Sequence, residues 1–242
     1  MIFTINAIKI IFLLGFLIFI HECGHFFVAK AFKIKVREFS LGFGPKLISK
    51  QGSETKYSLR WIPLGGYVDM VGEAERSDEE GSFSKASVLK RIAILLGGAV
   101  INIIFGLFCY FVLILIKTSI IEAFIATGGF VGSIVESLKL IFTGNVAVEQ
   151  MVGPVGISGI VVQSSGLFNF VYLLSIISVS LGVTNLLPIP ALDGGRIFLL
   201  IIEGLRKKPF KENTEIAINS IGFTFLILLS IYVTYNDVVR IF

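Results

Sequence analysis

The sequence predicts an all-α membrane protein with four transmembrane helices and a small membrane-associated β hairpin or sheet between the first two. Composition is the first reason: 55% of the 242 residues are hydrophobic, only 16% are charged, and the mean hydropathy is +0.88. About a quarter of the residues of a soluble domain are charged. The second reason is that the apolar residues gather in four long segments. Because the basic residues form no long run or stripe, no nucleic-acid partner is expected.

The four segments are long enough to cross a bilayer, which takes roughly 20 mostly apolar residues. They are Ala7–Phe32, Ile92–Ile116, Phe168–Leu187 and Ile216–Tyr235. The first also resembles a cleavable signal peptide, because Lys9 precedes an apolar run. That charged region is a single Lys, however, and the polar residues His21, Glu22 and His25 precede any cleavage site. The segment is therefore expected to remain as a helix.

A fifth, weaker apolar stretch runs from Ile120 to Phe142. It is interrupted by Gly128 and Gly129, and it carries Glu122, Glu136 and Lys139. Glycine lowers helix propensity, and charges are costly inside a bilayer. The sequence therefore predicts an interfacial or partly re-entrant segment here rather than a span.

The basic residues predict how the helices are oriented in the bilayer. Twelve Lys or Arg lie from Lys30 to Arg91 and five from Arg196 to Lys211, but only two lie in the connection 117–167. Loops rich in Lys and Arg remain on the cytoplasmic side. The connections after the first and third helices are therefore expected to be cytoplasmic, and both termini are expected on the other side.

The first segment contains the motif His21-Glu22-Cys23-Gly24-His25. Residues four apart lie on the same face of a helix, so His21 and His25 can present two imidazoles to one metal ion. Glu22 is rotated by only about 100° from His21, which places its carboxylate beside that ion. The pattern H-E-x-x-H is typical of zinc hydrolases, in which the Glu is the general base.

Such a short pattern also occurs by chance in soluble proteins. Here it lies at the end of an apolar run, where ionisable residues are costly and usually functional. Its two His are the only two in the chain. Both points favour a Zn²⁺ site.

A catalytic zinc site takes three protein ligands and leaves one position open. No third His exists, so Asp193, which follows Pro188 and Pro190, is the candidate for the third ligand. Taken alone, Asp193 would more readily be a helix cap at the membrane edge, but together with the first motif the role of metal ligand is favoured. The two Pro break the helix, and irregular backbone at membrane depth is tolerated only where it is buried in protein or lines a cavity.

The stretch Tyr57–Met70 alternates apolar and polar residues as a strand does. Its Gly65, Gly66 and Tyr67 follow a turn that contains Pro63. An edge strand here could pair with an extended substrate. A purely structural hairpin on the membrane surface is the alternative.

These residues together resemble the site-2 protease family of intramembrane metalloproteases, near the bacterial regulator-of-sigma-E protease branch. The resemblance rests on His21-Glu22-x-x-His25 and on Asn185-x-x-Pro188-x-Pro190-x-Leu192-Asp193-Gly194. It implies a multi-pass protein of the bacterial inner membrane. Because the motif lies near the end of the first segment that enters the basic connection, the active site is expected towards the cytoplasmic side. The resemblance also implies that Asn185, Pro188 and Pro190 handle substrate. The implied substrates are single-pass membrane proteins, such as an anti-sigma factor, or remnant signal peptides.

The chain departs from that branch between the second and third helices, where its members usually carry PDZ domains. The connection 117–167 is short and largely apolar, so it cannot hold a PDZ domain. We therefore expect residues 1–242 to form a single protease domain, with at most an interfacial helix in this connection.

Two other function classes are consistent with parts of the sequence. A membrane metal-ion transporter would need a row of ionisable groups along a path, but here they form one cluster. An inactive binding module would not need Glu22. Asn102, an amide in an apolar helix, is predicted either to bind substrate or to form an interhelical hydrogen bond.

Overall fold

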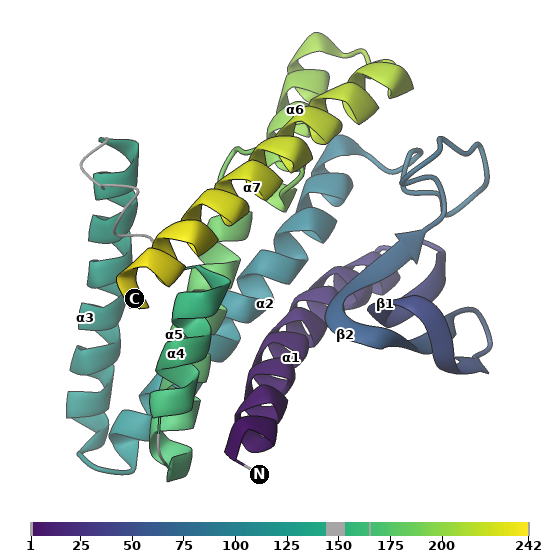
Figure 1. Cartoon of the computed structure of the whole chain (residues 1–242). Coiled ribbons are helices and arrows are strands. Elements are labelled where there is room, and N and C mark those ends of the chain that lie inside the picture. The colour runs from purple at the N-terminus through teal and green to yellow at the C-terminus, as the bar shows by residue number, and fades with distance from the viewer. Residues whose placement is uncertain (1, 144–152, 165, 242) are drawn as a thin grey trace.

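A computed structural model describes residues 2–143, 153–164 and 166–241 (Figure 1). Two strands follow the first helix, and the other regular elements of the described chain are helices. The elements are α1 (Ile2–Ala31), β1 (Val36–Gln51), β2 (Lys56–Met70), α2 (Val88–Leu115), α3 (Ile120–Phe142), α4 (Pro154–Gln163), α5 (Gly166–Asn185), α6 (Asp193–Arg206) and α7 (Glu212–Ile241).

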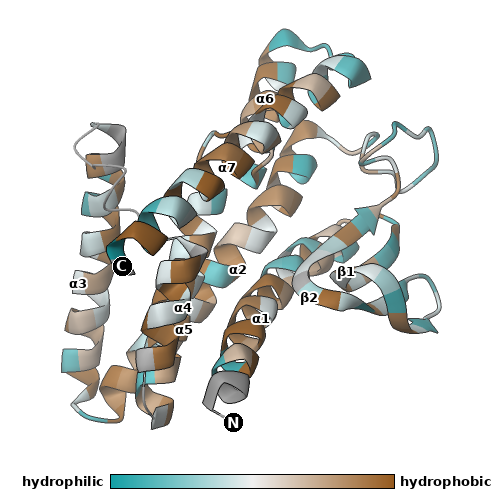
Figure 2. Cartoon of the chain, in the orientation of Figure 1, coloured by the Kyte–Doolittle hydropathy of each residue, from teal (hydrophilic) through white to brown (hydrophobic). Residues whose placement is uncertain are grey.

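Five of the described helices are long and apolar enough to cross a membrane: Asn6–Ala31, Val88–Leu115, Ile120–Leu140, Gly166–Asn185 and Glu212–Arg240. Figure 2 shows hydrophobic residues along most of their length. The prediction of a multi-pass membrane protein with a small sheet after the first helix is confirmed. The prediction of four spanning helices is wrong by one, because α3 is also a candidate span.

The α3 helix continues through Gly128 and Gly129 without a break. In an apolar medium, backbone groups must be paired within the segment, so a helix can persist where glycine would weaken it in water. Two of its charges lie near its ends, Glu122 in the first turn and Lys139 in the last. There they suit the helix dipole and remain close to the polar interface.

The α2 helix lies at the centre of the bundle and packs against α1, α5 and α6. Glycine allows its closest approaches. A Cβ atom on Gly24 of α1 would lie 2.2 Å from the carbonyl oxygen of Gly97 on α2. A Cβ on Gly106 of α2 would lie 2.6 Å from the carbonyl oxygen of Ser175 on α5. Small residues at such contacts let membrane helices pack backbone to backbone.

The strands β1 and β2 form an antiparallel sheet beside α1 (Figure 1). Both strands are long and bent, and residues 38–41 of β1 have partners in two parts of β2. Phe39, for example, is opposite both Tyr57 and Val68. Residues 66–70 have a pairing partner on one side only in this sheet, so they form one of its edges.

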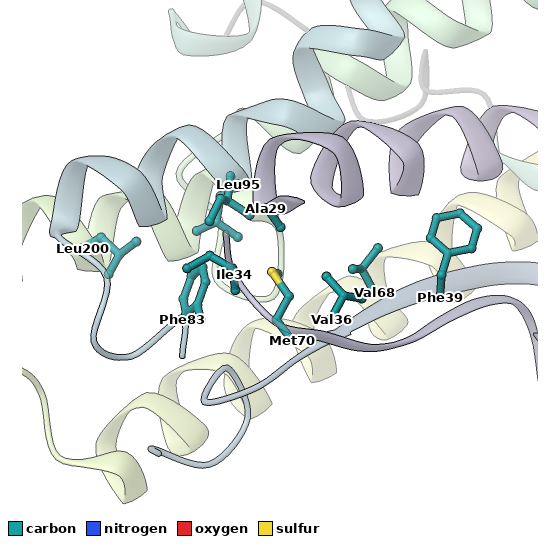
Figure 3. Packing of buried hydrophobic residues seen from close by; sticks show 10 residues of the cluster. Ala29, Ile34, Val36, Phe39, Val68, Met70, Phe83, Leu95 and Leu200 are labelled. Atoms are coloured by element: carbon teal, nitrogen blue, oxygen red, sulfur yellow. The ribbon is translucent and has the colours of Figure 1, made fainter. Parts of the chain in front are cut away.

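A hydrophobic core holds the sheet against the helices (Figure 3). Val36 and Phe39 of β1 and Met70 of β2 are buried in it together with Leu95 of α2. Leu200 of α6 belongs to the same cluster. The edge 66–70 is thereby fixed relative to α1, α2 and α6.

Residues 186–192 interrupt the helices between α5 and α6. Pro188 and Pro190 lie in this break, and Ala191 adopts a positive φ of 75°. The α7 helix supports the break: a Cβ on Gly222 would lie 2.3 Å from the carbonyl oxygen of Pro190, and Asn219 Oδ1 accepts a hydrogen bond from Ala191 N. The irregular backbone predicted before Asp193 is thus present, and Asp193 opens α6.

Candidate active site

Three potential metal ligands from α1 and α6 converge in the structure. His21, His25 and Asp193 each offer a ligand atom, and these atoms all lie within 4.8 Å of one another. Asp193 Oδ2 is 3.0 Å from His21 Nε2 and 3.3 Å from His25 Nε2, and the two Nε2 atoms are 3.1 Å apart. Both imidazoles are buried.

The Nδ1 atoms of the two imidazoles, which face away from the cluster, also have neighbours. His25 Nδ1 donates a hydrogen bond to the carbonyl oxygen of Ile94 on α2, at 2.9 Å. A neutral His that donates through Nδ1 has a free lone pair on Nε2, which faces the cluster. His21 Nδ1 lies 3.3 Å from Asn102 Nδ2. Two imidazoles and a carboxylate, each with an atom aimed at one point, fit a zinc ion.

The space for these imidazoles depends on Gly98 of α2. A Cβ atom at this position would lie 2.4 Å from His25 Nε2 and 2.8 Å from His21 Cε1. A side chain here would collide with both rings. Nothing in the spacing of the sequence motif indicated this residue, because the contact joins two helices.

Glu22 lies beside the cluster in a cavity of about 190 Å³. Gly66 on the edge of the sheet lies directly against it, since a Cβ there would be 3.0 Å from Glu22 Cγ. The cavity is lined by His21, Glu22, His25, Gly66, Tyr67, Val68, Met70, Glu73, Leu95, Asp193 and Arg196. The helical motif, the sheet edge and the start of α6 therefore share one space.

An ion pair closes one part of this cavity. Arg196 Nη1 of α6 is 2.7 Å from Glu73 Oε1, which follows β2. Burial disfavours the charge of Arg196, but Glu73 more than offsets this and raises its pKa above the usual value. Acidic stretches such as Glu73–Glu80 are usually solvated, but the side chain of Glu73 is mostly buried in this ion pair. The fold joins Glu73 to a cation more than a hundred residues away.

Only some of the other predicted site residues line this cavity. Gly66 and Tyr67 line the cavity, whereas Gly65 packs against the ring of Phe43. Asn185 donates a hydrogen bond to the carbonyl oxygen of Leu181 in its own helix. Asn185, Pro188 and Pro190 are not among the residues that line the cavity.

Tyr67 is part of a polar network on the sheet. Arg60 donates hydrogen bonds to Tyr67 Oη, at 2.6 Å, and to Glu38 Oε1, at 2.9 Å. Ser58 also donates to Glu38. Burial opposes ionisation of Glu38, but the bonds from Ser58, Arg60 and Lys46 outweigh it and lower its pKa to about 2.

Two buried imidazoles on a helix long enough to cross a membrane, with a carboxylate from α6 beside them, define a membrane metalloprotein with a hydrolase-type site. Residues 9–229 match the family model of peptidase family M50. The chain belongs to that family, and the resemblance to site-2 proteases is confirmed. It is a zinc-dependent membrane protease.

Several relatives carry protease names. A protein of Clostridium acetobutylicum, provisionally named a zinc metalloprotease, is 29% identical over 330 residues that cover 97% of each chain. That alignment is longer than the 242 residues of this chain, so part of the relative has no counterpart here. The zinc metalloprotease RasP of Shouchella clausii is 46% identical over 112 residues, which are 46% of this chain and 27% of the relative. The regulator of sigma-W protease RasP of Bacillus subtilis is 41% identical over 46% of this chain and 26% of its own.

Proposed function

We propose that this protein is an intramembrane zinc endopeptidase that cleaves single-pass membrane proteins within or near their transmembrane segments. The observation that carries the proposal is the convergence of His21, His25 and Asp193 beside Glu22. In this proposal the first three residues hold zinc. Bound zinc supplies Lewis-acid activation of water and of the scissile carbonyl group.

Glu22 is the general base in this proposal. Its carboxylate shares the cavity with the proposed ligands, so it can accept a proton from the attacking water and later deliver it to the leaving amine. Arg196 and Glu73 complete the polar wall with a pair of opposite charges.

The substrate must be unwound before it is cut, because the carbonyl groups of a helix are hydrogen-bonded. Residues 66–70 are a sheet edge, and Gly66, Tyr67 and Val68 of that edge line the cavity. We infer that an extended substrate segment adds to this edge and so passes Glu22. The absence of a side chain at Gly66 lets the strand approach Glu22 closely. We also propose that Asn185, Pro188 and Pro190 contact the substrate outside this cavity, at the break that leads into Asp193.

The proposed location is the bacterial inner membrane, with the active site towards the cytoplasm. The motif lies near the end of α1 that leads into the connection with twelve Lys or Arg. We also propose that the chain acts as one protease domain without a PDZ domain. One relative is named a regulator of sigma-W protease, which supports a membrane-bound regulator as substrate.

The substitution Glu22→Gln tests the proposal against a metal transporter and an inactive binding module. Zinc content and cleavage of a reporter membrane peptide are measured on the same preparation. We expect zinc to be retained and cleavage to be lost. The control is Glu79→Gln, which changes an exposed carboxylate paired with Lys35 and leaves both readouts unchanged. Undiminished cleavage by Glu22→Gln would refute the assignment.

A further inference from the structure

Asn102 on α2 is fully buried, with 0% of its surface exposed. Its Nδ2 atom lies 3.3 Å from His21 Nδ1, and Ser178 Oγ of α5 donates to its backbone carbonyl oxygen at 2.8 Å. It is not among the residues that line the cavity beside Glu22. A role in direct contact with substrate does not fit this position.

Which of Asn102 and His21 donates the hydrogen bond depends on which ring nitrogen of His21 carries the proton. With Nδ2–H as donor, His21 Nδ1 must accept, so the proton of the neutral ring lies on Nε2. That proton then donates to Asp193 Oδ2 at 3.0 Å. This is a consistent arrangement without a metal.

Coordination of a metal through Nε2 reverses this arrangement. The lone pair on Nε2 is then used, so the proton of the neutral ring lies on Nδ1. A protonated Nδ1 cannot accept from an amide N–H and needs an acceptor instead. Asn102 has one: its Oδ1 atom is buried and has no hydrogen-bond partner.

We propose that Asn102 is the positioning residue for His21: with zinc held on Nε2, its carboxamide oxygen accepts a hydrogen bond from Nδ1–H. The oxygen and nitrogen of a carboxamide are nearly equal in size, so either atom can face the ring without disturbing the close packing between α2 and α5. The proposal rests on the proposed function, because it takes His21 as a zinc ligand.

Partners on the outward nitrogen of a metal-bound His set the ring orientation, and their loss typically weakens metal binding by about 10–100-fold. His25 already has a fixed partner in the Ile94 carbonyl group. A backbone carbonyl can only accept, and so it serves one tautomer. A side-chain amide serves both, which gives His21 a partner with and without the ion.

The first test is the zinc dissociation constant of three variants in detergent. Asn102→Leu keeps the branch at Cγ and removes both polar atoms, and we expect its dissociation constant to rise about 10–100-fold. Asn102→Asp keeps an acceptor and should bind at least as tightly as wild type. Ser175→Ala is the control, because Ser175 is buried in the same α2–α5 interface and bonds to its own helix. A dissociation constant for Asn102→Leu within twofold of wild type overturns the proposal.

The second test reads the tautomer directly and does not depend on the folding of any Asn102 variant. The chain has only two His, so ¹⁵N-His labelling gives four ring-nitrogen signals, which His25→Gln assigns. We expect zinc to move the His21 proton from Nε2 to Nδ1. Zinc-bound wild type without a proton on Nδ1 overturns the inference about Asn102. Zinc binding that is unaffected by His21→Ala would instead overturn the proposed ligand set.

Discussion

Replacing Gly98 by Ala tests whether the proposed zinc site depends on the contact between α1 and α2. The added Cβ atom would lie 2.4 Å from His25 Nε2, 2.7 Å from His25 Cε1 and 2.8 Å from His21 Cε1. Non-bonded carbon and nitrogen atoms rest at roughly 3.4–4 Å. The rings or the helix must therefore shift by about 1 Å.

A shift of this size is large compared with the tolerance of a metal site. Zinc–nitrogen distances are about 2.0–2.1 Å and vary by only about 0.2 Å. A misplacement of about 1 Å in a catalytic group can reduce the rate by about 100-fold. We expect Gly98→Ala to bind zinc at least 10-fold more weakly and to lose cleavage by about 100-fold or more. Zinc content by mass spectrometry and cleavage of a reporter membrane peptide measure the two effects.

The matched control is Gly128→Ala on α3, where an added Cβ would meet nothing within 4 Å. Alanine is favoured over glycine inside a helix by about 0.5–1 kcal/mol, so this variant should be as stable as wild type or slightly more so. Gly98→Ala with full zinc content and full activity would show that the rings do not occupy the positions described, and the reasoning would be wrong.

Three further predictions concern stability. Asp237→Ala removes the carboxylate that accepts from Gly153 N and Gly156 N at 3.2 and 2.8 Å, and should cost about 1–3 kcal/mol in thermal unfolding; an unchanged melting temperature would contradict this. Because the pKa of Glu38 is lowered to about 2, its contribution to stability is present above its ordinary pKa of about 4.3 and is lost as the pH falls through about 2. Ser58→Ala should raise that pKa, so unfolding would begin at a higher pH; an unshifted acid transition would refute the role of this bond. Chelation of zinc should lower the melting temperature. The reason is that free zinc at 100 times its dissociation constant stabilises the folded protein by about 2.7 kcal/mol. An unchanged melting temperature would argue against a resident ion.

The local parts of the site could be predicted from sequence because they depend on short-range periodicity. Residues four positions apart, as His21 and His25 are, lie on the same face of any helix. Because the chain has no third His, the third ligand was expected to be a carboxylate, and Asp193 was the candidate. The break at Pro188 and Pro190 was likewise readable, since proline cannot continue a helix. The strands were indicated by alternation and by glycine.

Other features depend on contacts that no local pattern encodes. Gly98 and Asn102 lie in an apolar helix whose sequence does not reveal which face meets α1. The pairing of Arg196 with Glu73 joins α6 to the end of β2. The sequence predicts an interfacial or re-entrant segment where α3 is a candidate span. The reason is that helix propensities measured in water overstate the effect of a glycine pair in an apolar medium. The double pairing of residues 38–41 follows from bends in both strands, and bends of this kind depend on tertiary packing.

The position of Asp193 depends on how α6 docks, and two of the docking contacts are ion pairs. The α6 helix packs mainly against α2, and Glu203 of α6 forms a buried ion pair with Arg91 of α2. One polar atom on each partner, Arg91 Nε and Glu203 Oε2, has no hydrogen-bond partner. Burying such a pair contributes little net stability, because desolvation offsets the attraction. Its directional bond and the Arg196–Glu73 pair instead add two polar contacts at defined positions along α6. The carboxylate of Asp193 therefore reaches the two imidazoles on a helix that is held both by charge pairing and by burial of Leu200 in the hydrophobic core.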